Sequence, residues 1–170
     1  FSTAKKRLLR LNREHPESSF LKESFLWLSR CQWKLGETES AQLDLQKLSK
    51  SLEQENGPRD QRVQVAITLG EIHIELGDKS AAVVQLRKAV NLSKDSILKG
   101  QLLLRSGALL LQINQPEKAL ETYQEALKVS SDSDHLNAAN LEVVRILRLL
   151  EKWDEAIETI QLLLSDDKFS

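Results

Sequence analysis

The chain has 170 residues, 41% of them hydrophobic and 29% charged, and a formal net charge of −1. This near-neutral charge gives no general reason to expect nucleic acid or an anionic membrane as a partner. The single cysteine, Cys31, excludes an internal disulfide, and no apolar run reaches the roughly 18 residues that a membrane-spanning helix needs.

In chain order, the first expected element is a helix within residues 1–15. Its apolar face consists of Ala4, Leu8 and Leu11. Pro16 ends it, because the residue before a proline resists the helical conformation. The helix that would pair with it lies upstream of the chain, and the chain contains no Met. We therefore expect an orphan second helix in a fragment of a longer protein.

The helix pairs that follow share a repeat. A small residue early in each second helix recurs at intervals of 37, 41, 37 and 37, at Ala4, Ala41, Ala82, Ala119 and Ala156. Five residues before this mark, the turn position holds Gly36, Gly77, Asn114 and Glu151. The agreement predicts one repeat domain over residues 1–170. Its parts are the orphan helix 1–15 and repeats at 19–55, 60–94, 96–129 and 135–165.

Turn residues set the expected helix ends. Gly77 suits the left-handed residue after a helix, and Asp78 suits the N-cap of the next one. Pro116 fits the first position of a helix. The turn signal Asn56-Gly57-Pro58 lies within the long interval of 41 residues, between Ala41 and Ala82. We interpret this interval as one extra turn on each flanking helix. Residues 166–170 are expected to fray.

These residues resemble the tetratricopeptide repeat family, whose motif combines a Leu-Gly pair, a turn glycine and a stripe of small and aromatic residues. The best matches are Leu69, Gly70, Gly77, Ala82 and Ala89, and Gly107, Ala119, Tyr123 and Ala126. The resemblance implies an all-α, right-handed α-α superhelix of about four antiparallel helix pairs. It also implies that Gly70 and Gly107 face Ala82 and Ala119. The repeats exceed the usual length of about 34 residues and lack the family's early Trp.

A second resemblance concerns the junction from His15 to Ser18 and the long repeats. Both are similar to bacterial envelope assembly lipoproteins of the same repeat family. That resemblance implies a periplasmic location. Without it, the sequence predicts a soluble chain and leaves the cytoplasm and the periplasm open.

Catalytic and metal-binding patterns are missing from the sequence. It contains no HExxH, CxxC or P-loop motif. Glu71, His73 and Glu75 alternate by two and therefore scatter around a helix, so we expect His73 in or near the core. Asp132 and Asp134 lack the glycine and distant glutamate of a calcium loop, and a solvated turn is the better interpretation. The chain is predicted to have no enzymatic activity, no metal and no cofactor.

The family resemblance implies that the first helices of the pairs line a concave groove. One phase holds Leu26, Ile67, Leu104 and Leu141, a second holds Trp33, Ile74, Leu111 and Arg148, and a third holds Arg30, Glu71, Ala108 and Arg145. Lys and Asn, which clamp a terminal carboxylate in one subgroup of the family, are missing from these phases. A largely apolar groove favours a protein or peptide partner, such as an amphipathic helix. The alternative is that neighbouring helices cover these side chains.

Charge is polarised along the chain, with a sum of +5 over residues 1–13 and −5 over residues 132–170. A basic amphipathic helix can bind acidic lipid or nucleic acid. The preferred interpretation is the solvated face of a terminal helix, with no nucleic-acid partner. The leading hypothesis is a noncatalytic protein–protein interaction scaffold. The alternatives are a structural component of an envelope assembly or secretion complex, and a regulatory repeat domain of a larger enzyme. The oligomeric state stays open.

Overall fold

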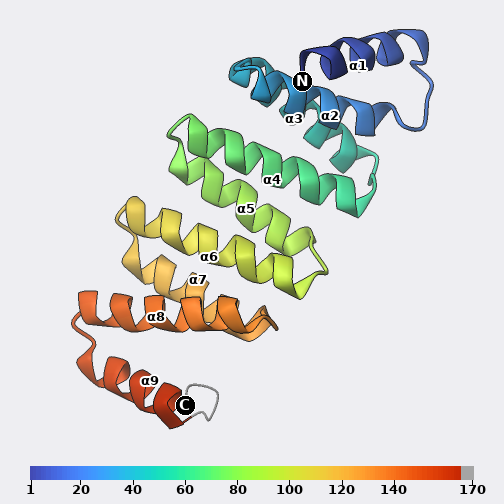
Figure 1. The fold of residues 1–170 in the computed structure, drawn as a ribbon. Coiled ribbons are helices and arrows are strands. Elements are labelled where there is room, and N and C mark those ends of the chain that lie inside the picture. Colours follow the sequence, from blue (N-terminus) through green and yellow to red (C-terminus); the bar gives the residue numbers. More distant parts are fainter. Residues whose placement is uncertain (166–170) are drawn as a thin grey trace. The chain divides into compact units, whose positions relative to one another are not determined.

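The computed structural model describes residues 1–165, and this part of the chain consists of helices joined by short connections, without strands (Figure 1). The expected all-α fold of antiparallel helix pairs is confirmed. The predicted fraying of residues 166–170 lies outside the described residues. The helices are α1 (Ser2–Glu14), α2 (Leu21–Lys34), α3 (Thr38–Gln54), α4 (Arg59–Glu75), α5 (Lys79–Leu92), α6 (Ser96–Gln112), α7 (Pro116–Val129), α8 (Ser133–Leu149) and α9 (Trp153–Ser165).

The chain divides into two compact units, unit 1 from Phe1 to Leu92 and unit 2 from Ser93 to Ser170. Unit 1 therefore holds α1 to α5, and unit 2 holds α6 to α9. Each unit is described by itself. Among the described residues, no helix combines the length and the apolar composition that crossing a membrane requires.

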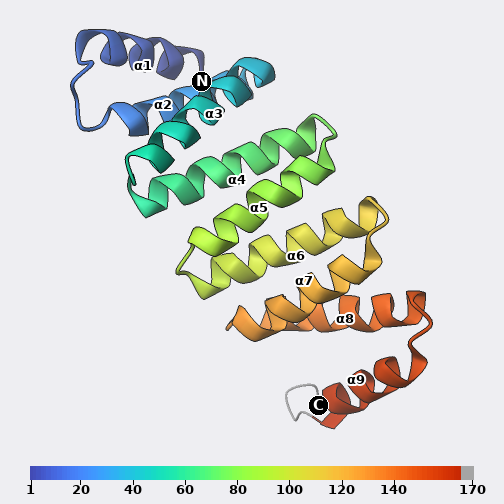
Figure 2. The ribbon, with the colours of Figure 1, turned by 180° about the vertical axis from the view of Figure 1, so that it is seen from behind.

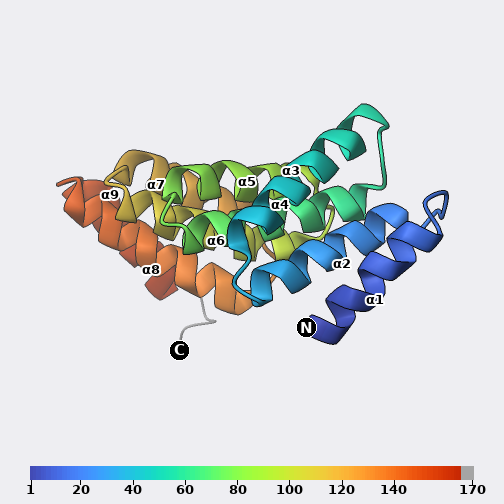
Figure 3. The ribbon, with the colours of Figure 1, turned by 90° about the horizontal axis from the view of Figure 1, so that it is seen from above.

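In unit 1, α2 pairs with α3 and α4 pairs with α5, while α1 lies beside α2 (Figures 2 and 3). The aliphatic core includes Leu45, Leu52 and Ile72, each fully buried. By contrast, α1 contains no buried residue. An ion pair between Lys5 and Glu37 and a hydrogen bond from Ser24 to Asn12 hold α1 in place.

The expected stripe of the second helices forms the tightest packing of unit 1. Ala82, Leu86 and Ala89 of α5 are all fully buried. They face α4, where the missing side chain of Gly70 makes room. A Cβ on Gly70 would stand 2.9 Å from Cδ2 of Leu86. The predicted neighbour Ala82 is also close, because its carbonyl oxygen would lie 3.7 Å from the same Cβ.

In unit 2, α6 pairs with α7 and α8 with α9, and α8 also packs on both α6 and α7. The residue nearest to Gly107 is Tyr123, whose Cε2 and Cζ lie 2.7 Å from the position of an ideal Cβ. The ring of this tyrosine therefore packs over the glycine. That Gly107 also faces Ala119 stays a prediction.

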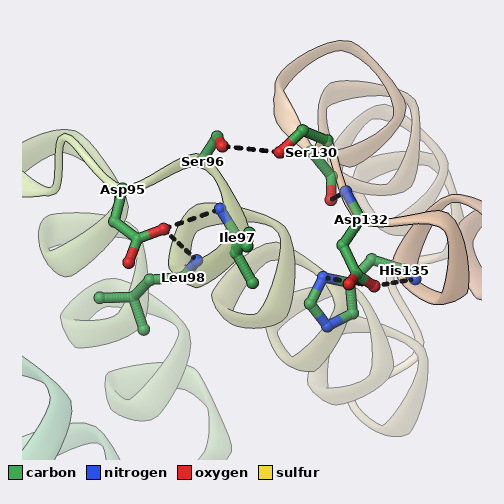
Figure 4. A network of polar contacts seen from close by, with 8 residues as sticks. Asp95, Ser96, Ile97, Leu98, Ser130, Asp132 and His135 are labelled. Atoms are coloured by element: carbon green, nitrogen blue, oxygen red, sulfur yellow. Dashed lines mark hydrogen bonds and ion pairs between the residues drawn. The ribbon is translucent and has the colours of Figure 1, made fainter.

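Aspartates begin both first helices of unit 2 (Figure 4). The Asp95 carboxylate accepts hydrogen bonds from the backbone N–H of Ile97 at 2.9 Å and of Leu98 at 3.1 Å. Asp132 accepts from the N–H of His135 at 3.0 Å. Each such N-cap stabilises its helix by about 1 kcal/mol. Asp132, in the short loop before α8, is therefore the capping residue of this helix.

The predicted turn position is left-handed in every helix pair. Gly36 and Gly77 have φ of 82° and 79°, and Asn114 and Glu151 both have φ of 57°. Asp78 accepts a hydrogen bond from the N–H of Ala81 at 3.0 Å, as expected of an N-cap. The turn geometry is thus conserved between pairs even where glycine is replaced, at a conformational cost for Asn and Glu.

The two helices that flank the long interval, α3 and α4, have 17 residues each. The second helices α5 and α7 have 14 residues, so α3 is longer than both. Among the first helices, α2 has 14 residues, whereas α6 and α8 have 17 like α4. An extra turn on each flanking helix, measured against the usual repeat of about 34 residues, stays a prediction.

Candidate partner-binding surfaces

The first helices of unit 1, α2 and α4, are joined by a polar network. The Arg30 guanidinium donates to Gln64 Oε1 at 2.6 Å and to Thr68 Oγ1 at 3.2 Å. It also stacks over the ring of Trp27, 4.9 Å from the centroid. Partial burial lowers the pKa of the Arg30 guanidinium. Arg30 thus braces α2 against α4, and its donors are directed at the protein itself.

Trp33 has a similar internal role. Its indole N–H donates to Glu75 Oε2 at 2.6 Å, and the Thr38 hydroxyl donates to Glu75 Oε1 at 3.2 Å. The Lys34 ammonium lies 4.1 Å from the centre of the Trp33 ring. Glu75 therefore connects the ends of α2 and α4 with the start of α3. The polar side chains described on this face thus form hydrogen bonds with other residues of unit 1.

The remaining predicted site residues of unit 1 differ in exposure. Leu26 is only 4% exposed and belongs to the core. Ile67, Glu71 and Ile74 of α4 are half-buried. Leu26 therefore packs inside unit 1 and offers no surface to a partner. The three α4 residues keep part of their surface accessible.

Unit 2 contains a cavity of about 690 Å³ between its helices. Its lining comes from four helices: Ala108, Leu111 and Gln112 of α6, Tyr123 of α7, Glu142, Arg145, Ile146, Arg148 and Leu149 of α8, and Trp153 of α9. The volume falls within the range of about 300–1,000 Å³ that is typical of binding pockets. Apolar side chains with a few polar groups among them make this cavity suitable for a partner's side chains.

The polar groups of the cavity influence one another. Burial, with a further contribution from the Glu142 carboxylate, raises the pKa of Tyr123 to about 12, and Arg145 opposes this shift. Arg145 Nη1 lies 3.6 Å from Glu142 Oε1, beyond hydrogen-bonding distance. Glu142 Oε2 is buried without a hydrogen-bond partner. An unsatisfied buried acceptor is costly, so this oxygen is a natural anchor for a donor from a bound molecule.

Two of the predicted site residues of unit 2, Leu111 and Arg145, meet in this cavity. Leu104 is half-buried outside the lining, and Leu141 is 69% exposed, also outside it. The prediction missed Tyr123, Glu142, Ile146, Leu149 and Trp153 as site residues. Glu142 stands three residues before Arg145, and Tyr123 is the aromatic residue of the second-helix stripe. Both residues are conspicuous in the sequence. Their spacing along the chain, however, does not indicate that they line the same cavity.

The candidate reactive side chains belong to unit 1, whereas the cavity belongs to unit 2. His73 is 8% exposed, as predicted, and its Nδ1 is 3.8 Å from Asp78 Oδ2. Cys31 is buried. Over the range 1–165, no three His, Cys, Asp or Glu side chains come together as a potential metal site.

Comparison with known proteins identifies the repeat. Residues 63–96 and 100–133 each match the tetratricopeptide repeat family. The chain contains tetratricopeptide repeats. The matched segments lie on the α4–α5 and α6–α7 pairs, where the sequence motif was strongest. No curated protein matches the sequence.

Solved structures of tetratricopeptide repeat proteins share the fold. A protein from Parabacteroides merdae aligns with a TM-score of 0.68 and 16% identity, over 97% of this chain and 59% of that one. MamA aligns at 0.66 and 16%, over 96% and 86%. YrrB, described as a tetratricopeptide repeat protein with an unusual peptide-binding site, aligns at 0.61 and 17%, over 95% and 75%. The chain thus spans 59% of the Parabacteroides protein, and such identities show likeness of fold.

Tetratricopeptide repeats are scaffolds for protein–protein interaction, and their fold is typically noncatalytic. This assignment confirms the family and the general class of function predicted from the sequence. The residues that contact a partner stay a prediction.

Proposed function

We propose that this chain is a noncatalytic scaffold that holds a protein segment, an amphipathic helix or an apolar peptide, in the cavity of unit 2. The observation that carries the proposal is the apolar lining of Leu111, Ile146, Leu149 and Trp153 around the unsatisfied oxygen of Glu142. Apolar anchors supply affinity, and a convergent polar group fixes orientation.

The cavity suits a peptide better than the face of α2 and α4 does. In unit 1, Arg30 and Trp33 already donate to Gln64, Thr68 and Glu75. In unit 2, the side chain of Arg145 is 76% exposed, and Leu149 and Trp153 are 66% and 56% exposed. These groups are accessible without breaking an existing network. The groove residues predicted in unit 1 therefore have a smaller part in the proposal than Leu111 and Arg145.

The partner segment must match two features of the cavity. One or two aliphatic or aromatic side chains would cover Leu149 and Trp153, and burying each is worth roughly 1.5–3 kcal/mol before ordering costs. A backbone or side-chain N–H would donate to Glu142 Oε2, which removes the cost of an unpaired buried acceptor. An amphipathic helix or an apolar peptide provides both kinds of group. The envelope-assembly and enzyme-regulatory alternatives stay predictions.

The test uses peptides selected for binding to the wild-type chain from a displayed random library. Their dissociation constants are then measured by calorimetry for wild type, Leu149→Asp and Leu43→Asp. Leu149 lines the cavity, whereas Leu43 lies on α3 of unit 1 and is 56% exposed, so the two changes are matched in chemistry and exposure. Circular dichroism verifies that both variants keep their helices.

We expect Leu149→Asp to weaken binding by at least about tenfold, which corresponds to about 1.4 kcal/mol. Leu43→Asp should leave the affinity within about twofold of wild type. Equal affinity for all three proteins would move the binding surface away from unit 2. Recovery of no binding peptide from the library would also count against the proposal.

A further inference from the structure

A groove separates the two second helices of unit 1, α3 and α5. Within residues 1–92, α4 packs on both of these helices, and they do not pack on each other. The groove has a volume of about 680 Å³, and the end of α3, the start of α4 and one side of α5 line it. The lining residues used below are Glu53, Arg62, Val84, Lys88 and Asn91. All three helices lie inside the chain, with further helices before and after them.

A charged bridge spans this groove. Lys88 Nζ pairs with the carboxylate of Glu53 and donates to Ser49 Oγ at 2.9 Å. The Ser49 hydroxyl in turn donates to Glu53 Oε1 at 3.2 Å. The hydrogen bond from Lys88, with the charges of Lys88 and Arg62, lowers the pKa of the Glu53 carboxyl. Glu53 is therefore ionised, and its charge is engaged by residues of unit 1.

Arg62 has a donor that the protein does not use. Its Nε–H is buried without a hydrogen-bond partner, while the side chain lines the groove. An unpaired buried donor is costly, and more so when it carries a charge. The Nε and one Nη of an arginine form an edge that a carboxylate can accept from with both oxygens. Lys88 has three N–H donors and uses two of them within the bridge. The groove thus offers donors to an anionic group.

The remaining lining indicates which kind of anion fits. Val84, Lys88 and Asn91 have the i, i+4, i+7 spacing, so they lie on one stripe of α5. Val84 is 63% exposed, and aliphatic surface therefore adjoins the cations. A nucleic acid would bring a row of phosphates, which the Glu53 carboxylate repels and the valine does not contact favourably. A peptide with an acidic side chain beside an aliphatic one matches both the charge and the apolar surface.

We propose that the groove between α3 and α5 is a docking site for an acidic segment of a partner protein. A carboxylate of that segment accepts from Arg62, and an aliphatic side chain beside it covers Val84. The groove belongs to unit 1 and the peptide cavity to unit 2. The proposal therefore stands independently of what the cavity binds.

The first experiment selects peptides on the wild-type chain from a displayed random library at low salt. Their dissociation constants are measured by calorimetry for wild type, Arg62→Gln and Arg59→Gln. Arg59 is the first residue of α4, exposed and outside the lining, so its change removes the same charge from the same helix. We expect a family of peptides that combine Asp or Glu with aliphatic residues. Arg62→Gln should weaken their binding at least about tenfold, and Arg59→Gln by less than about twofold.

A second pair of variants tests the aliphatic wall of the groove. Val84 and Leu43 occupy the same position of successive repeats, two residues after Ala82 and Ala41, and are 63% and 56% exposed. Val84→Glu should weaken the acidic peptides at least about tenfold, because it replaces apolar surface by a like charge. Leu43→Glu, outside the lining, should leave their affinity unchanged. Because both side chains are exposed, neither change disturbs the core, and circular dichroism verifies this.

The outcomes that would overturn the proposal are specific. Recovery of no acidic peptide, or of acidic peptides that bind Arg62→Gln and Val84→Glu as tightly as wild type, would exclude this groove. Acidic peptides that are lost only with Leu149→Asp would belong to the cavity of unit 2 instead. A short single strand of DNA and vesicles of phosphatidylserine are measured alongside. Tighter binding of either through Arg62 than of any peptide would replace the protein segment as the occupant.

Discussion

The packing of α6 on α7 makes a quantitative prediction for Gly107. An ideal Cβ at this position would stand 2.7 Å from Cε2 and Cζ of Tyr123 and 3.0 Å from Cδ2. Carbon atoms in favourable contact are about 3.5–4.0 Å apart. An added methyl group must therefore displace the ring, which is only 3% exposed, or separate the helices. Such overpacking costs about 1–3 kcal/mol, and replacing glycine by alanine in a helix returns about 1 kcal/mol.

We expect Gly107→Ala to lower the free energy of unfolding by about 1 kcal/mol, or the melting temperature by roughly 2–4 °C. Urea unfolding followed by circular dichroism measures this change. Gly70→Ala is the comparison, since the atoms nearest to its Cβ would be Cδ2 of Leu86 at 2.9 Å and Cγ at 3.2 Å, farther than the ring atoms at Gly107. That variant should lose less stability than Gly107→Ala. In a Tyr123→Leu background the penalty of Gly107→Ala should disappear. A Gly107→Ala protein as stable as wild type would refute the contact between helix and ring.

Two further predictions concern unit 2. Glu151 has φ of 57°, a left-handed conformation that is strained for any residue with a side chain, so Glu151→Gly should raise stability by about 1 kcal/mol. Gly77→Ala is the control in the opposite direction, and it should lower the melting temperature. A Glu151→Gly protein with the stability of wild type would argue against a left-handed conformation at residue 151. Tyr123, the chain's single tyrosine, should titrate with a pKa of about 12 by ultraviolet absorbance, and Glu142→Gln should lower this pKa. Because the unfolded chain loses the phenolic proton first, near pH 10, stability should fall from pH 10 to 12; a midpoint near 10 in the folded protein would contradict the burial.

The features that could be predicted from the sequence are local ones. Gly77 and Asp78 fix a helix end and the next helix start through their own backbone and side-chain chemistry, with no help from distant residues. The spacing of Ala82 and Leu86 likewise determines which side of α5 is apolar. Such features require only the few residues around them, and the structure has them where the sequence placed them.

The candidate site could be predicted only in part, because it depends on neighbours. Leu26 and Leu141 occupy the same phase of the repeat, yet they are 4% and 69% exposed. The position in the repeat determines which side of its helix a residue occupies. It does not determine whether another helix covers that side. Tyr123, Arg145 and Trp153 meet in one cavity because three helices place them together. The spacing of residues within one helix does not predict which side chains of other helices lie beside them.

The central claim, that the cavity of unit 2 is the partner-binding site, is tested most directly by nuclear magnetic resonance. A peptide selected for binding to wild type is titrated into the isotope-labelled chain, and the amide and indole shifts are followed. The account predicts that the largest changes occur at Ala108, Leu111 and Glu142 and at the indole N–H of Trp153. Changes centred instead on Arg30 and the indole N–H of Trp33, with the cavity residues unmoved, would contradict it.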